Sequence, residues 1–104
     1  MVKILITKQA KEDLRNIKDF IQKDSYQNSI KVLQSILEKI ETLEKFPEIG
    51  KIIARTSTGP LRPILVYSYR IIYRFENNNV EVLTVHHSSR LLSNNPGIGE
   101  YFED

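Results

Sequence analysis

The chain of 104 residues contains no cysteine, and this absence excludes two kinds of chemistry. It can form no disulfide and can offer no thiolate as nucleophile or metal ligand. It also lacks a glycine-rich phosphate loop, a nucleophile elbow and a zinc-binding pattern. No apolar run approaches the ~20 residues that cross a bilayer, and the first one is too short for a signal peptide. We therefore expect a protein without cofactor or membrane contact that acts in a reducing cytoplasm.

The composition is that of a folded domain, with 40% hydrophobic and 27% charged residues. Its net charge of +2 is unevenly distributed. Residues 51–90 hold six basic residues, five of them arginine, against two acidic ones, whereas residues 91–104 hold three acidic residues and no basic one. Because arginine makes forked contacts with phosphate and carboxylate, the middle block indicates a nucleic acid or an acidic protein as partner. Ordinary solvated surface is the alternative.

Hydrophobic periodicity predicts a strand followed by a helix at the start of the chain. Residues 2–6 are apolar at nearly every position, as in a short strand. Thr7 can cap a helix over residues 8–23, in which apolar side chains recur every three or four positions. Asp24 and Ser25 interrupt this pattern and offer the cap of a second helix.

The second helix is longer and carries one continuous apolar stripe. It should end near Phe46, because Pro47 disfavours helical backbone in the residue before it. So short a break between two helices predicts an antiparallel hairpin. The next segment, 51–60, is expected to contain no long element.

Strands are predicted for the remainder of the domain. Residues 61–67 form one strand, in which Pro63 argues for a sheet edge or a bulge. Residues 69–75 and 80–85 alternate in polarity around an asparagine-rich turn and give the strongest hairpin signal of the chain. The expected fold class is α+β, with an N-terminal strand and an antiparallel two-helix hairpin packed on a small antiparallel sheet.

The length of the hairpin loop decides which side chains face each other. If all three asparagines after Glu76 form the loop, Arg70 lies across from His86. A two-residue loop is expected to bring His87 opposite Arg70 and to place Glu76 against Glu81. The three-residue loop is preferred because it avoids this pair of like charges. In both cases one histidine lies beside Arg70.

The sheet face away from the helices is the candidate site. Strand alternation puts Arg70 and Arg74 on it, and Arg62 and Arg90 lie within reach, so these four are the predicted target-binding residues. Arginines can hold phosphate and stabilise charge that develops during cleavage, and a histidine can transfer a proton near neutral pH. The alternative is surface cations that pair with neighbouring glutamates. No metal site is expected, because adjacent histidines on a strand point to opposite faces.

Several short motifs, in their order and spacing, resemble the RelE/ParE toxin superfamily over about residues 2–92. They are Ala10-x-x-Asp13-Leu14-x-x-Ile17, Leu43-x-x-Phe46-Pro47-x-Ile49-Gly50, Leu61-Arg62, Tyr69-Arg70-Ile71-Ile72-Tyr73-Arg74 and Val85-His86-His87-Ser88-Ser89-Arg90. The resemblance implies a toxin of a type II toxin–antitoxin or plasmid stabilisation system, with the family's two helices on a small sheet. The toxin domain is expected over residues 1–92. The acidic residues 93–104 are expected to form a tail that is mobile or lies on the surface.

The resemblance also implies a cognate antitoxin as partner and one of two targets, DNA gyrase or mRNA in the ribosome. For the mRNA-cutting branch, Arg70 and Arg90 match the arginines of the family pattern, and His86 or His87 would supply the acid or base. That branch would be an endoribonuclease, whereas a gyrase poison is not an enzyme.

This sequence departs from the mRNA-cutting pattern at two places. Ile64 stands where a second strand lysine is expected, and no tyrosine closely follows Arg90. The turn around Pro47 and the histidine-to-arginine ending resemble the ParE side more. A ParE-like toxin directed at gyrase is therefore the preferred interpretation, with a RelE-like endonuclease as the first alternative and a toxin-like fold without toxicity as the second.

Overall fold

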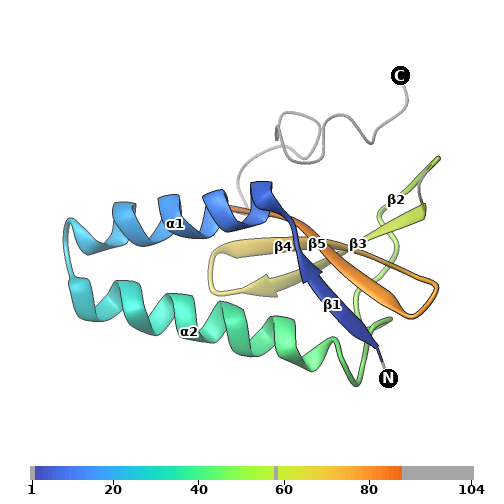
Figure 1. Cartoon of the computed structure of the whole chain (residues 1–104). Helices are drawn as coiled ribbons and strands as arrows, with labels where there is room; N and C mark the ends of the chain where they lie inside the picture. The colour runs from blue at the N-terminus through green and yellow to red at the C-terminus, as the bar shows by residue number, and fades with distance from the viewer. Residues whose placement is uncertain (1, 58, 88–104) are drawn as a thin grey trace.

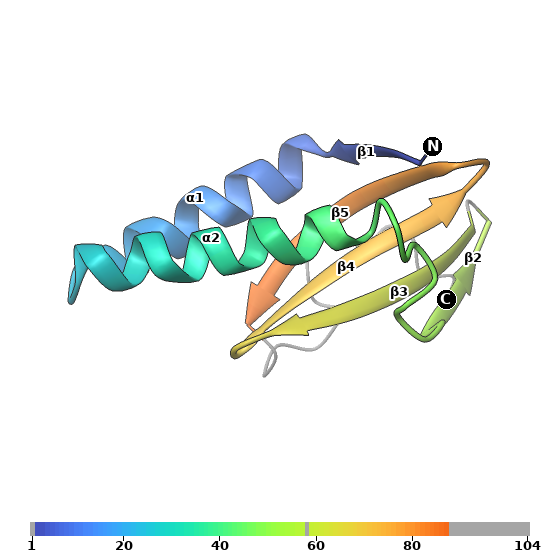
Figure 2. The ribbon, with the colours of Figure 1, turned by 90° about the horizontal axis from the view of Figure 1, so that it is seen from below.

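The computed structural model describes residues 2–57 and 59–87. Its elements are β1 (Lys3–Ile6), α1 (Lys8–Gln22), α2 (Tyr26–Thr42), β2 (Ala54–Thr56), β3 (Gly59–Val66), β4 (Tyr69–Glu76) and β5 (Asn79–His87). The five strands form one sheet in the order β1-β5-β4-β3-β2, and the two helices pack as a hairpin on one face of it (Figures 1 and 2). This confirms the α+β fold. The sheet is mixed rather than wholly antiparallel, because β1 runs parallel to β5.

The predicted end of the toxin domain after residue 92 and the predicted acidic tail over residues 93–104 lie outside the described residues. Within the described residues, no helix combines the length and the apolar character that a membrane crossing needs.

Thr7 joins β1 to α1 and fixes both. Its side-chain oxygen accepts a hydrogen bond from the N–H of Ala10 at 3.2 Å, which confirms the predicted helix cap. Its own N–H donates to the carbonyl oxygen of Val82 at 3.1 Å, and its hydroxyl donates to that of Leu83 at 3.0 Å. Thr7 thus continues the pairing of β1 with β5 one residue beyond the end of β1.

The second helix begins as predicted but ends earlier. The side chain of Ser25 accepts a hydrogen bond from an amide of the first turn. The helix then ends at Thr42, four residues before the expected end near Phe46. The Leu43 N–H bonds to the carbonyl of Ile40 at 3.0 Å, three residues back, so the last turn tightens. The chain has left the helix before Pro47 can act on it.

The loop between β4 and β5 contains two residues, Asn77 and Asn78, both at positive φ (54° and 62°). This is the backbone that a two-residue hairpin turn of type I′ requires, and asparagine tolerates it. The three-residue loop is therefore wrong, and Glu76 pairs with the first residue of β5. The expected clash with Glu81 does not arise, because Glu81 lies opposite Arg74.

A β-bulge in β5 then changes the register. Val82 and Thr84 pair with consecutive residues of β4, so Leu83 between them is the extra residue. Beyond the bulge Arg70 lies opposite His86, as predicted. The prediction is correct because two deviations cancel: the loop is one residue shorter than expected, and β5 contains one additional residue.

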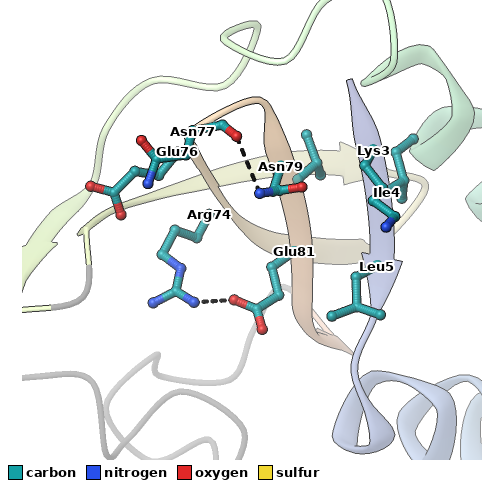
Figure 3. A pocket seen from close by; sticks show the side chains of 9 residues that line it. Lys3, Ile4, Leu5, Arg74, Glu76, Asn77, Asn79 and Glu81 are labelled. Atoms are coloured by element: carbon teal, nitrogen blue, oxygen red, sulfur yellow. Dashed lines mark hydrogen bonds and ion pairs between the residues drawn. The ribbon is translucent and has the colours of Figure 1, made fainter. Parts of the chain in front are cut away.

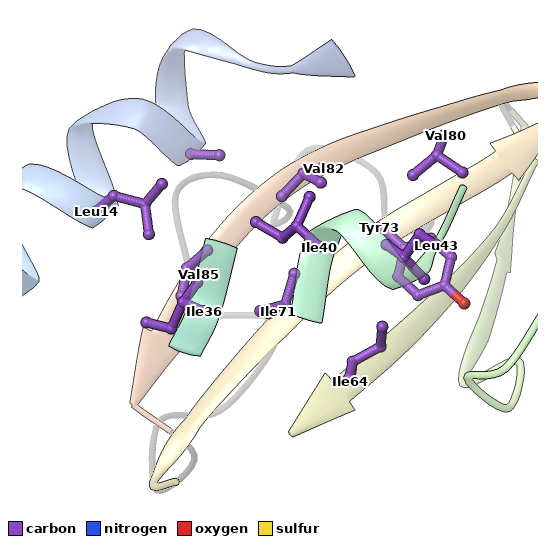
Figure 4. Packing of buried hydrophobic residues seen from close by; sticks show 11 residues of the cluster. Leu14, Ile36, Ile40, Leu43, Ile64, Ile71, Tyr73, Val80, Val82 and Val85 are labelled. Atoms are coloured by element: carbon purple, nitrogen blue, oxygen red, sulfur yellow. The ribbon is translucent and has the colours of Figure 1, made fainter. Parts of the chain in front are cut away.

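The hydrophobic core lies between the helices and the sheet (Figure 4). Its buried residues come from α1, from α2 and the residue that follows it, and from β3, β4 and β5. They are Ala10, Leu14, Ile36, Ile40, Leu43, Ile64, Ile71, Tyr73, Val80, Val82 and Val85. A smaller cluster of Leu61, Ile72 and Leu83 is buried apart from this core. We call the side of the sheet that carries Arg70, Ile72 and Arg74 the far face.

Pro63 lies at a position where β3 is an edge of the sheet, as was predicted for a proline. β2 pairs only with the first three residues of β3, Gly59 to Leu61. Pro63 therefore pairs with β4 on one side and has no strand on the other within the described part of the chain. Because proline has no N–H to donate, this is where a strand tolerates it.

Candidate functional site

The predicted site residues do not share one surface. Arg70 and Arg74 lie on the far face, because their neighbours in the strand, Ile71 and Tyr73, point into the main core. Arg62 lies opposite Tyr73, and therefore on the side of the helices. Arg90 falls outside the described residues. The structure thus separates Arg62 from the two arginines that it was expected to join.

Arg74 is engaged in an ion pair with Glu81 on the neighbouring strand (Figure 3). The two side chains are 20% and 27% exposed, so solvent reaches both and weakens their attraction. They line a surface hollow together with Glu76, Lys3 and Leu5. For Arg74, pairing with a glutamate was the alternative to target binding, and the structure supports this alternative.

The two histidines point to opposite sides, as adjacent strand residues must. His86 lies opposite Arg70 and is only 3% exposed. Its Nδ1 lies 2.9 Å from the carbonyl oxygen of His87, and since a carbonyl only accepts, the hydrogen-bonded Nδ1 carries the proton. The His87 ring is exposed and meets the ring of Tyr69 edge-on, with centroids 5.7 Å apart. The histidine beside Arg70 is thus the buried one.

Arg62 holds the loop that follows α2. Its Nη1 donates to the carbonyl oxygen of Gly50 at 2.7 Å and, with longer geometry, to that of Glu48 at 3.3 Å. The guanidinium group thereby ties β3 to the loop. This gives Arg62 a structural role that the sequence did not indicate.

The Tyr73 hydroxyl ties the same loop from inside the core. It donates to the carbonyl oxygen of Pro47 at 2.8 Å and accepts from the N–H of Gly50 at 3.1 Å. Burial raises the pKa of Tyr73 above its ordinary value, and the Gly50 hydrogen bond and the Arg62 charge offset part of this rise. Gly50 itself has no room for a side chain, because a Cβ there would lie 2.4 Å from the Pro63 carbonyl oxygen. The Phe-Pro-x-Ile-Gly and Tyr-Arg motifs therefore form one structural unit.

Asp13 is a residue whose role sequence reasoning missed. One carboxylate oxygen accepts from the Val85 N–H at 3.1 Å and from the Thr84 hydroxyl, and the other accepts from the Gln9 amide at 2.9 Å. The carboxylate thus caps the edge of β5 beyond the end of β1 and positions the strand just before His86. The sequence held one signal for this role: Asp13 is an acidic residue that directly precedes the buried Leu14, on the apolar side of α1.

The far face carries cationic side chains that can contact a partner. Within the described ranges, no group of three histidine, aspartate or glutamate side chains is placed to hold a metal ion. The far face offers one half-buried arginine beside a buried histidine and a second arginine with a glutamate partner. Such a surface can bind an anionic group.

Comparisons with known proteins agree with the fold. A family model described as the ParE toxin of the type II toxin-antitoxin system, parDE, matches residues 4–92. A comparison with curated proteins finds no match. Among solved structures, the chain is similar to one described as the chromosomal ParDE TA system from P. aeruginosa, with a TM-score of 0.67 and 21% identity, covering 84% of this chain and 96% of that one.

A second similar structure is described as the toxin-antitoxin complex RelBE2 from Mycobacterium tuberculosis. Its TM-score is 0.63 at 21% identity, and the match covers 83% of this chain and 96% of that one. At such identity these two structures show the fold alone, whereas the family model spans most of the sequence. The chain belongs to the ParE toxin family and is the toxin component of a type II toxin–antitoxin system.

Proposed function

We propose that this toxin stops growth by binding and inhibiting DNA gyrase, in the manner that its ParE resemblance implies. The observation that carries this choice is the burial of His86. An endonuclease needs an acid or base that reaches its substrate, by direct contact or through one water. His86, the histidine beside Arg70, is 3% exposed, and its Nδ1 is held by a backbone carbonyl.

The other predicted groups support a binding protein for the same reason. His87 is exposed but faces away from Arg70, next to Tyr69. Arg62 is committed to the loop after α2, and Arg74 to Glu81. A poison that acts by contact needs surface complementarity and no convergent acid, base and cation. Among the described residues, the exposed histidine and the half-buried Arg70 lie on opposite faces of the sheet, which supports a protein that acts by contact.

A RelE-like mRNA endonuclease is the second candidate function. Arg70 lies directly opposite His86, which is the cation and proton-transfer pair that cleavage would use. The likeness to a structure described as a RelBE2 complex agrees with this candidate at the level of the fold. A toxin-like fold without toxicity is the third candidate, and it predicts normal growth on expression.

We further propose that the chain acts in the cytoplasm and is neutralised there by a cognate antitoxin. Both similar structures are described as toxin–antitoxin systems. Arg70 is the arginine of the far face that is not in the ion pair with Glu81, so an acidic antitoxin side chain would complement it. Covering this face would place a protein segment over the half-buried Arg70 and the buried His86.

The test is to induce the gene in cells without antitoxin and to follow DNA and mRNA from the first minutes. A gyrase poison gives broken DNA bound to gyrase while mRNA stays intact. Early cutting of mRNA with intact DNA would overturn the proposal in favour of the endonuclease. His87→Gln serves as a control, because an exposed histidine on the opposite face of the sheet from Arg70 should leave a binding poison active.

A further inference from the structure

Exposed hydrophobic side chains concentrate in the loop between α2 and β2. Phe46, Ile49, Ile52 and Ile53 are 59%, 55%, 36% and 40% exposed. Four of the ten exposed large hydrophobic side chains of the described chain thus lie within eight residues. Single exposed hydrophobic residues are normal on a protein surface, but a concentration of them marks an interaction site. We call these four side chains the loop patch.

Phe46 and Ile49, the first two residues of the loop patch, lie together on one surface. The Ile49 N–H donates to the Phe46 carbonyl oxygen at 3.2 Å, which turns the chain back on itself. Phe46, Pro47 and Ile49 then line one shallow hollow, with Lys45 and Glu48 at its margin. The hollow is open and mostly apolar, so it offers contact area to an apolar side chain of another protein.

The backbone under the loop patch is fixed. The Tyr73 hydroxyl and the Arg62 guanidinium together bond the carbonyl or amide groups of Pro47, Glu48 and Gly50. The Ile53 N–H donates to β3 at 2.9 Å. The loop is therefore held by the buried Tyr73 and the half-buried Arg62 while it presents its apolar side chains outward. A surface ordered in advance loses little conformational entropy when a partner binds.

Charges around the loop patch define the chemistry of that partner. Lys45, Lys51 and Arg55 are exposed along the loop against the single acidic residue Glu48, which gives residues 45–55 a net charge of +2. A complementary surface is acidic at its margin and apolar at its centre. Three of the four patch side chains are isoleucine, whereas single-stranded nucleic acid is bound by stacking on aromatic rings. The patch therefore fits a protein.

The position of the loop patch indicates that the target, rather than the antitoxin, binds to it. It is anchored by Arg62 and Tyr73, which point to the helix side of the sheet. Arg70 and Arg74, where we propose the antitoxin binds, lie on the far face. We infer that the loop patch is the surface by which this toxin docks on an acidic, apolar-centred region of its target protein. This inference rests on the proposed function in that the toxin acts by contact with a target protein, whichever protein that is.

The experiment compares full-length F46S/I49S with L65S/Y67S, a matched control. Leu65 and Tyr67 are 60% and 61% exposed, so the control removes equally exposed side chains from another surface. We expect F46S/I49S to inhibit gyrase supercoiling about 10-fold more weakly and to lose growth arrest, because buried apolar anchors dominate protein affinity. The control should remain within about twofold of wild type, as replacements outside a contact have small effects.

Each outcome decides the inference. Unchanged growth arrest by F46S/I49S overturns it, and so does a loss of antitoxin binding while arrest persists. If wild-type protein does not inhibit gyrase but the patch variant alone loses arrest, the loop patch stands and gyrase is the wrong target. Ile49→Glu, a single change at a 55% exposed position, provides a second variant if the double variant unfolds, and it should also lose arrest.

Discussion

Removing one oxygen atom from Tyr73 should weaken the whole domain. In Tyr73→Phe the ring stays in the core, so no cavity forms and packing is kept. What is lost is the hydroxyl that donates to the Pro47 carbonyl and accepts from the Gly50 N–H. Both groups belong to the loop after α2, and the Gly50 bond is buried.

The magnitude follows from the groups left behind. A buried N–H without a partner costs about 1–3 kcal/mol, and the lost bond to Pro47 adds about 0.5–1.5 kcal/mol. We expect a decrease of about 2–4 kcal/mol in the free energy of unfolding. For a domain of this size that is a large share of a total of about 5–15 kcal/mol.

Urea denaturation followed by circular dichroism measures this change. With a slope of about 2 kcal/mol per molar urea, the middle of the usual range, the midpoint should fall by roughly 1–2 M. Tyr69→Phe is the matched control, because Tyr69 lies on the same strand and its hydroxyl has no hydrogen-bond partner among the described residues. If both variants unfold at the same urea concentration, the hydroxyl does not anchor the loop.

The raised pKa of Tyr73 adds a dependence on pH. Burial favours the neutral hydroxyl, so the folded-state pKa lies above the unfolded value of about 10. The contribution is fully present below pH 10 and is lost as pH rises through the folded-state pKa. Wild type should therefore lose more stability than Tyr73→Phe as pH rises above about 10. Equal losses in this range would contradict the assignment.

Three further changes probe other contacts. Asp13→Asn should cost about 1–3 kcal/mol, because it disturbs the cap on the edge of β5, while Asp19→Asn on the exposed side of α1 should be near neutral; urea midpoints compare them. Gly50→Ala should cost about 1–3 kcal/mol or prevent folding, since the new methyl group would lie 2.4 Å from a β3 carbonyl oxygen, and a midpoint equal to wild type would disprove the close approach. A double-mutant cycle of Arg74→Ala and Glu81→Ala should give a coupling of about 0–1 kcal/mol that falls with salt, as both groups are partly exposed.

Local signals in the sequence predicted much of the fold. Both helix starts follow from local capping signals, Thr7 for α1 and the pair Asp24-Ser25 for α2, of which Ser25 is the residue that caps. The helical stripes and the strand alternation follow from burial of one face, which recurs with a fixed period. The edge position of Pro63 follows from its missing N–H.

The register of β4 with β5 could not be predicted from local signals. The residues around the bulge at Leu83 are all ones that strands favour, so the sequence gives no indication of a bulge there. It arises where β1 ends and Thr7 and Asp13 take over the edge of β5, which is a contact between distant parts of the chain. Arg62 was misplaced for a similar reason, because the pairing of β3 with β4 decides its side of the sheet.

The candidate site depended on the same distant contacts. The pairing of Arg70 with His86 was predicted, but the burial of His86 was not, since burial depends on what packs around a strand. The roles of Asp13 and Tyr73 were missed because their partners lie 72 and 26 residues away in the chain. Side chains that act through distant backbone groups resemble ordinary core or surface residues in a sequence.

The most direct measurement is to add purified full-length protein to gyrase with relaxed plasmid, and in parallel to ribosomes translating a labelled mRNA. The proposed function predicts that supercoiling stops and that cleaved plasmid remains bound to gyrase, with the mRNA uncut at the same protein concentration. Active supercoiling together with mRNA cut in the ribosome would contradict it, and would mean that the burial of His86 does not prevent cleavage.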